Sequence, residues 1–275
     1  MLVNVPLTAP KNQNATMCGM DSGENTLKLA RLKSTRYDLG PPDDRFGRNH
    51  LFVEEARKYA NILECGCSTG FIARLIREGG SRIVGLEIDP EAAEQARRFC
   101  TEVLLVDLNH RDWSGKIEAQ FDLVTFGDVL EHLLDPENSL RQARRVLAPG
   151  GRILISLPNI AHWTMRIKLL LGRFIYQPTG LLDYTHLRFF TVITARRMIE
   201  AAGYRIVRFH PVFAGRLTGH FRPMWQRLTN LRPNLFAFQM LFLIEPDETG
   251  VMKNNPPQRR RGAQEKQKQE TGNIN

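Results

Sequence analysis

The residues best suited to chemistry form one short run of acidic, sulfur-containing and glycine residues, Glu64-Cys65-Gly66-Cys67-Ser68-Thr69-Gly70. Glycines at a turn between a strand and a helix let a ligand approach the backbone, and the helix offers free N–H groups. The spacing of Gly66 and Gly70 differs from the GxGxxG pattern of dinucleotide sites. Glu64 would repel a pyrophosphate but would tolerate a cation. The run therefore favours a cationic cofactor.

Three further acidic residues, Glu87, Asp107 and Asp128, follow the next apolar runs along the chain. A carboxylate after the second run can accept both hydroxyls of a ribose, and Asp107 beside an apolar residue suits an adenine. Acidic residues at strand ends also cap helices, which is the alternative for any one of them. Four such ends in order favour one ligand site. The ribose contact alone does not separate NAD from an adenosyl cofactor, but a cation beside Glu64 fits S-adenosylmethionine, a sulfonium. The residues predicted to bind it are Glu64, Gly66, Cys67, Gly70, Glu87, Ile88, Asp107, Leu108 and Asp128.

The elements that must position these residues follow from the hydrophobic pattern. We predict strands at residues 61–65, 82–88, 102–108, 121–126, 152–157, 205–212 and 236–244, and helices at 71–77, 91–99, 136–147, 164–171 and 194–202. Strands that alternate with helices indicate an α/β fold with a doubly wound, mostly parallel sheet. The last two strands have no obvious full crossover helix between them, so we expect them to pair antiparallel at one edge.

These motifs make residues 60–160 similar to the class I (Rossmann-like) S-adenosylmethionine-dependent methyltransferases. Glu64-x-Gly66-x-x-x-Gly70 matches the first motif of that family, with Ser68 where a third glycine is common. Glu87 matches the ribose-binding acid and Asp107 the acid on the adenine side. The resemblance implies S-adenosylmethionine as cofactor and a seven-stranded sheet with a reversed last strand. We expect a helical insertion after the fifth strand.

A narrower resemblance rests on the segment from Pro158 to Thr191, which carries PNIAHW and GLLDYTHLRFFT. It is similar to a bacterial subgroup that includes methionine-biosynthesis W-type and polysaccharide-associated methyltransferases. The resemblance then extends over residues 60–212. It implies methylation in the cytoplasm and leaves the acceptor open.

Methyl transfer needs alignment with the sulfonium and, for a hydroxyl or amine acceptor, a base. We predict His162, Asp183 and His186 as the catalytic residues, because they follow the fifth strand at the edge of the sheet where ligands bind. A local hydrogen bond for His162, and a buried polar network for the other two, are the alternatives. Residues 159–192 are the predicted lid over the acceptor.

Asp128, Glu131 and His132 have a spacing that would place them on one face of a helix. The segment resembles one in ubiquinone-biosynthesis O-methyltransferases, where related positions bind a divalent metal. Here Asp replaces Glu at the first position, and similar segments occur in many methyltransferases without a metal. We therefore expect contact with the cofactor and no metal site.

Charge is distributed unevenly along the 275 residues, whose formal net charge is +9. Residues 61–160 carry 11 basic and 15 acidic residues, whereas residues 161–240 carry 12 basic and 2 acidic ones. An acidic half suits a sulfonium, and the basic segment points to an anionic acceptor, for example a phosphorylated one held by Arg166, Arg173 and Arg188. The alternative is that these arginines are ordinary solvent-exposed residues on the faces of helices.

Composition limits the other possibilities. The chain contains no apolar run of about 18 residues, so we expect no membrane span. Four scattered cysteines do not suggest a disulfide scaffold, and a cytoplasmic location is expected. We expect residues 1–35 to be flexible, residues 36–245 to form the methyltransferase domain, and residues 246–275 to be a disordered basic, Gln-rich tail.

The sequence thus predicts an enzyme that transfers a methyl group to a small-molecule or glycan-type acceptor. The first alternative is an RNA methyltransferase that uses the basic segment and the Arg259–Arg261 run, although no separate RNA-binding module is recognisable. The second is a partner protein that binds the adenosyl cofactor and regulates another enzyme without catalysis.

Overall fold

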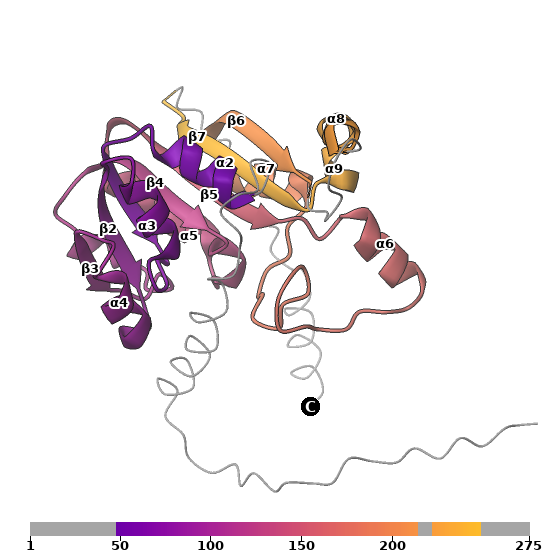
Figure 1. The fold of residues 1–275 in the computed structure, drawn as a ribbon, viewed down its shortest axis with the longest axis horizontal. Helices are drawn as coiled ribbons and strands as arrows, with labels where there is room; N and C mark the ends of the chain where they lie inside the picture. The colour runs from indigo at the N-terminus through magenta and orange to yellow at the C-terminus, as the bar shows by residue number, and fades with distance from the viewer. Residues whose placement is uncertain (1–47, 214–221, 249–275) are drawn as a thin grey trace, which may run out of the picture.

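A computed structural model describes residues 48–213 and 222–248 of the chain. One seven-stranded sheet runs through this part, in the order β3-β2-β1-β4-β5-β7-β6 (Figure 1). Its strands are β1 (Asn61–Cys65), β2 (Arg82–Glu87), β3 (Glu102–Leu105), β4 (Phe121–Gly127), β5 (Leu147–Pro158), β6 (Tyr204–Val212) and β7 (Gln239–Pro246). The segment 1–35 that we expect to be flexible, and most of the predicted tail, lie outside the described residues.

The pairing confirms the predicted doubly wound sheet with a reversed last strand. β1 pairs in parallel with β2 and β4, β2 with β3, and β4 with β5. β7 is antiparallel to both of its neighbours, β5 and β6. The last strand therefore lies between β5 and β6, and β6 forms the edge.

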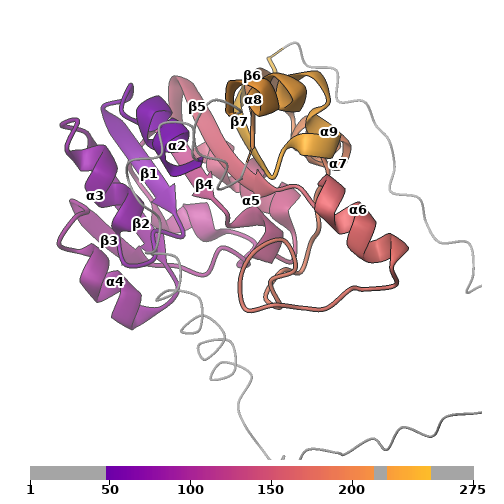
Figure 2. The same cartoon turned by 45° about the vertical axis from the view of Figure 1, so that its right-hand side comes forward.

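Helices cover both faces of the sheet, as parallel strands require (Figures 1 and 2). One face is covered by α2 (Arg48–Ala56), α3 (Phe71–Arg77) and α4 (Pro90–Ala96), whose buried side chains share a core cluster with β-strand residues. The other face is covered by α5 (Pro136–Arg145) and α7 (Val192–Ala201). Short 3-10 turns, η1 (Trp113–Lys116) and η2 (Leu130–His132), follow β3 and β4, and α8 (Arg222–Leu231) and α9 (Pro233–Phe236) precede β7.

Several boundaries differ from the predicted ones for local reasons. β3 ends at Leu105 rather than at residue 108, so Asp107 lies in the loop that follows the strand. β5 begins at Leu147, well before the predicted residue 152, because Leu147 pairs with Phe121 across a register shift. The glycines at 150 and 151, where the sequence predicts a turn, belong to this irregular strand. β7 begins only at Gln239, because α9 occupies the residues before it.

The predicted insertion leaves the sheet at the end of β5 and contains α6 (Trp163–Leu170). Asn159, fully buried, fixes its start: its side chain donates to the carbonyl of Ala237 over 2.7 Å and accepts from the N–H of Ala161 over 3.0 Å. Figure 2 shows α6 and the loop after it projecting beyond the sheet. No helix in the described ranges 48–213 and 222–248 is long and apolar enough to span a membrane.

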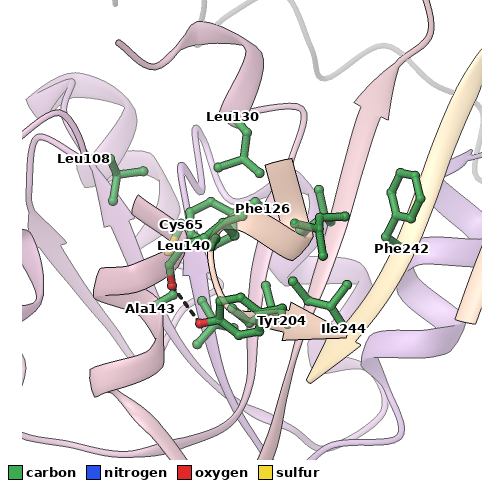
Figure 3. Close-up of a cluster of buried hydrophobic side chains, with 14 of the residues drawn as sticks. Cys65, Leu108, Phe126, Leu130, Leu140, Ala143, Tyr204, Phe242 and Ile244 are labelled. Carbon is green, nitrogen blue, oxygen red and sulfur yellow. Dashed lines mark hydrogen bonds between the residues drawn. The ribbon is translucent and has the colours of Figure 1, made fainter. Parts of the chain in front are cut away.

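The largest core cluster joins β4, β5 and β7 to α5 and β6 (Figure 3). Tyr204 lies inside it and donates its hydroxyl to the carbonyl oxygen of Leu140 over 2.7 Å. Burial raises the pKa of the Tyr204 phenol, so the hydroxyl stays protonated and remains a donor. The bond ties the start of β6 to the middle of α5.

Removing this hydroxyl should lower stability with little change in shape. For Tyr204→Phe we expect the free energy of unfolding to fall by about 1 kcal/mol, because a buried carbonyl loses a hydrogen-bond partner. Urea unfolding followed by circular dichroism measures the change. Tyr176→Phe, at a tyrosine that is 54% exposed, is the matched control and should leave stability unchanged. An equal loss in both variants would contradict the assigned role.

Candidate functional site

A cavity of about 440 Å³ lies beyond the carboxyl ends of β1, β2, β3 and β4. Parallel α/β sheets bind ligands at this edge, and the volume suits a small organic molecule. Eight of the nine residues predicted to bind the cofactor line it: Glu64, Gly66, Cys67, Glu87, Ile88, Asp107, Leu108 and Asp128. Gly70 does not line it and instead precedes α3, with a φ of 82° and its carbonyl accepting from the N–H of Arg74.

The turn after β1 is built so that its backbone faces the cavity. Gly66 has a φ of 72°, and a Cβ added there would lie 2.7 Å from Cγ2 of Val129. Only glycine fits both the backbone conformation and the space. Ser68, which stands where a third glycine is common, also has a positive φ of 51°. Its N–H donates to Glu87 over 2.8 Å, a bond that holds the turn in place.

Glu87 joins the ends of β1 and β2 through its carboxylate. One oxygen accepts from the N–H of Ser68, and the other accepts from the N–H groups of Ile88 and Asp89 at 2.9 and 3.0 Å. Burial raises the pKa of Glu87, and the three backbone donors oppose that rise. The carboxylate is therefore fixed at the cavity wall, and its Oε2 keeps a lone pair that a ribose hydroxyl can use.

Glu64 supplies a second carboxylate to the same cavity. It is 5% exposed, and its Oε2 has no hydrogen-bond partner within the described part of the chain. Burial, and then the nearby charges of Cys100 and Glu87, hold the pKa of Glu64 well above its usual range. A buried acceptor of this kind fits a cationic ligand, because the positive charge would favour the ionised form and supply the missing partner.

Asp128 is held by several protein groups at the cavity wall. Its φ is 55°, an unusual value outside glycine, and its Oδ1 accepts from the hydroxyl of Ser156 over 2.6 Å. Its Oδ2 forms an ion pair with Arg48 and also accepts from Gln239 over 3.4 Å. Asp128 therefore joins α2, β5 and β7 while it lines the cavity.

The structure places Glu131, His132 and His186 together next to this wall. Oε1 of Glu131 lies 4.0 Å from Nε2 of each histidine, and the three residues offer ligand atoms that all lie within 4.8 Å of one another. Asp128 does not share a helix with Glu131 and His132, since the 3-10 turn η2 begins at Leu130 and Asp128 precedes it. Within the described ranges, this buried group is the one whose residue types and spacing could hold a metal ion. The expectation of no metal stays a prediction.

The predicted catalytic residues all lie outside the lining of the cavity. His162 is buried against Phe238, its Nδ1 lies 2.8 Å from the Thr164 hydroxyl, and burial lowers its pKa to about 4. Asp183 accepts from the N–H and the hydroxyl of Thr185 at 2.8 and 2.7 Å. His186 packs against His132, which lines the cavity, and all three catalytic roles stay predictions.

Other residues that line the cavity were not predicted from the sequence. Arg48, Asn49 and Phe52 come from α2, which was not predicted. Phe52, Val53 and Ala56 have helical spacing and are buried, a pattern that could have revealed α2. Tyr184, Thr185 and Leu187 also line the cavity and belong to the predicted insertion. The backbone N–H groups of residues 187 and 188 both donate to the carbonyl of Glu131, which joins this segment to the turn after β4.

Glu87 provides a direct test of the cofactor site. Glu87→Ala should weaken the binding of S-adenosylmethionine by about 10- to 100-fold, because hydrogen bonds to a charged acceptor are lost. Isothermal titration calorimetry measures the affinity, and circular dichroism checks the fold. Glu94→Ala, at an exposed glutamate of α4, should bind as the wild type does. Unchanged affinity in the folded Glu87 variant would contradict the site.

Glu64 should oppose stability while it supports binding. Its folded-state pKa is raised, so the folded chain holds this proton more tightly than the unfolded chain does. Stability from this group is therefore present at low pH and is lost as pH rises from the unfolded pKa toward the folded one. At a neutral pH, Glu64→Gln should raise the free energy of unfolding without cofactor and lower cofactor affinity about tenfold or more.

Urea unfolding and calorimetry, each measured at acidic and neutral pH, separate the two effects. The stability gained by Glu64→Gln should shrink as pH falls. Glu118→Gln, in the connection between η1 and β4, serves as an exposed control for loss of a negative charge. Equal behaviour of the two variants would show that the Glu64 carboxylate neither costs stability nor contacts the ligand.

The comparisons with known proteins agree with this geometry. A family model described as a methyltransferase domain matches residues 38–208. The ubiquinone biosynthesis O-methyltransferase of Aeromonas salmonicida is 26% identical over 166 residues, which cover 58% of this chain and 69% of that protein. That of Idiomarina loihiensis is 24% identical over 212 residues, with 71% and 85% covered.

A solved structure shares the fold. The N-methyltransferase NodS of Bradyrhizobium japonicum, in complex with S-adenosyl-L-homocysteine, superimposes with a TM-score of 0.52 and 15% identity, covering 83% of this chain and 100% of that one. The family match spans the glycine turn, the acidic strand ends and the wall formed by the insertion. The chain therefore belongs to the methyltransferase domain family and is a class I S-adenosylmethionine-dependent methyltransferase.

Proposed function

We propose that this methyltransferase modifies an oxygen or nitrogen of a small-molecule or glycan-type acceptor that carries negative charge. The observation that carries the proposal is that Tyr184, Thr185 and Leu187 of the insertion line the same cavity of about 440 Å³ as the cofactor residues. A cavity of this size, which must also hold the cofactor, admits a small molecule or the end of a chain.

The basic residues of segment 161–240 favour an anionic acceptor mainly through the electrostatic field around the site, rather than through contacts inside the cavity. Of the three arginines suggested by the sequence, Arg188 donates to the carbonyl of Leu134, a residue that lines the cavity. Arg166 and Arg173 lie outside the lining. The excess of basic residues in 161–240 would still raise the local concentration of an anion near the entrance.

His132 is the group best placed to remove a proton from the acceptor. It lines the cavity, and its Nδ1 lies 3.0 Å from the carbonyl oxygen of Thr185. A carbonyl oxygen only accepts, so Nδ1 carries the hydrogen of the neutral ring and Nε2 carries the basic lone pair. The Glu131 carboxylate, 4.0 Å from Nε2, would stabilise the resulting imidazolium.

S-adenosylmethionine supplies an already activated methyl group, so the protein needs to align the acceptor and deprotonate it. Tyr184 and Thr185 position the acceptor against the cofactor residues. His132 accepts the proton that the hydroxyl or amine loses as its bond to the methyl carbon forms. The ring of His186 packs against that of His132 with a centroid distance of 4.7 Å, and its Nε2, 4.0 Å from Oε1 of Glu131, would help to position that carboxylate.

This assignment predicts a specific loss of activity. His132→Gln should lower the rate of methyl transfer about 100-fold or more and leave S-adenosylmethionine affinity unchanged, because a base is removed without touching the cofactor residues. His110→Gln, at an exposed histidine, should behave as the wild type does. Activity should also survive treatment with a chelator. Loss of activity on chelation, with recovery on adding Mn²⁺ or Zn²⁺, would assign the Glu131 cluster to a metal instead.

The assay uses S-adenosylmethionine with a tritiated methyl group and an extract of cell metabolites and polymers. We expect label in molecules that pass an ultrafilter and bind to an anion-exchange resin. Nuclease-sensitive label in the retained fraction would instead indicate RNA as acceptor. Cofactor binding without label in any fraction would indicate a non-catalytic partner protein.

A further inference from the structure

The insertion carries an unusual exposed surface that the cofactor site does not use. Every residue from 166 to 180 is exposed. We call residues 163–176 the insertion tip. Its large apolar side chains have exposed fractions of 38% to 86%. Soluble proteins rarely expose so many apolar side chains next to one another. These exposed side chains are Trp163, Ile167, Leu169, Leu170, Leu171, Phe174, Ile175 and Tyr176.

The insertion tip is also uniformly basic. Arg166, Lys168 and Arg173 lie among the apolar residues, and residues 159–182 contain no aspartate or glutamate. Arg166 donates to the carbonyl of Ala161 over 2.8 Å. Across the described ranges, Lys168 and Arg173 form no ion pair. Their charges are therefore available to an anionic partner.

The shape of the tip is that of a protrusion. Only Met165 of α6 is buried, in a small cluster with Leu181 and Leu182 that anchors the base of the tip. Figure 2 shows α6 and the loop after it standing away from the sheet. A groove would suit a peptide helix, whereas a projecting apolar end suits insertion into a soft apolar layer.

We propose that the insertion tip binds the surface of an anionic phospholipid bilayer. Leucine, isoleucine and aromatic side chains would enter the boundary between headgroups and acyl chains, with Trp163 and Tyr176 at the polar interface. Lys168 and Arg173 would meet lipid phosphates, and each basic residue near such a surface strengthens binding. No span is involved, because α6 has eight residues.

A second copy of the chain fits the tip less well. A symmetric dimer through the tip would bring Lys168 and Arg173 of both copies together, with no acidic residue in residues 159–182 to pair with them. A nucleic acid would satisfy the charges but would leave the aliphatic side chains, such as Leu170 and Leu171, without an apolar environment. The membrane surface satisfies both the apolar and the basic groups.

The tip continues directly into the wall of the cavity. Gln177 and Asp183 form a β-bridge that closes the loop, and the chain then reaches Tyr184 and Thr185 in the lining. An enzyme docked by the tip would therefore hold its acceptor wall beside the membrane. This proposal does not depend on the chemical nature of the acceptor, and vesicle binding is measured without any methyl transfer.

Flotation of the full chain with vesicles tests the proposal. Phosphatidylcholine vesicles with and without phosphatidylglycerol are the probes. We expect binding to the mixed vesicles that weakens as salt is added. Leu170→Glu, at a leucine that is 86% exposed, should lower the partition coefficient about tenfold or more, and Leu170→Phe should preserve it. Lys168→Gln with Arg173→Gln should lower it roughly 25-fold on mixed vesicles.

Val207→Glu, on the edge strand β6, is the matched control and should bind as the wild type does. Calorimetry with S-adenosylmethionine should give the same affinity for all variants, which shows that each is folded. Binding of Leu170→Glu equal to that of the wild type would overturn the proposal and move the contact to another basic part of the chain. A concentration-dependent dimer abolished by Leu170→Glu would assign the tip to a second copy instead.

Discussion

The pairing of β1 between β2 and β4 is the constraint on which the site depends. Parallel pairing brings the carboxyl ends of three strands to one edge, and each end supplies part of the cavity wall. The Glu87 carboxylate then locks two of these ends together through backbone N–H groups on both sides. Because these donors belong to the backbone, the lock depends on strand register more than on neighbouring side chains.

This arrangement places two acidic groups, Glu64 and Glu87, in a region of low solvent access. Burial raises the pKa of both, so their ionised forms cost the fold stability, and a cationic ligand would offset that cost. Replacing these carboxylates by neutral groups would remove that cost. It would also remove the negative charge by which the site favours a sulfonium cofactor over an anionic dinucleotide. The strained backbone at Ser68 and Asp128 adds to the same pattern, since both lie at the cavity wall.

Much of the fold and of the cofactor site could be predicted from the sequence, because both depend on local patterns. Strand β1 and helix α3 occur where the pattern placed them. Eight of the nine predicted cofactor residues line the cavity, since acids at the ends of parallel strands must converge. The helices between β6 and β7 were not predicted, although α8 carries apolar residues at helical spacing, namely Met224, Trp225, Leu228 and Leu231.

The acceptor side was less predictable, because its contacts join residues far apart in the chain. His132 and His186 come together through tertiary contacts, among them the bonds from the N–H groups of residues 187 and 188 to the carbonyl of Glu131. No spacing of residues in the sequence predicts these hydrogen bonds. Arg48 was missed for the same reason, since its partner Asp128 lies beyond β1, β2 and β3.

The position of β7 between β5 and β6 bears on the order in which the molecule assembles during synthesis. The strands of the cofactor site, β1 to β4, pair among themselves, so these pairings need no strand that follows β4 in the chain. The edge strand β6 has no partner in the sheet until β7, the last strand made, inserts beside it. A ribosome-bound chain can thus complete the cofactor half first, while β5 and β6 wait as unpaired edges for the final strand.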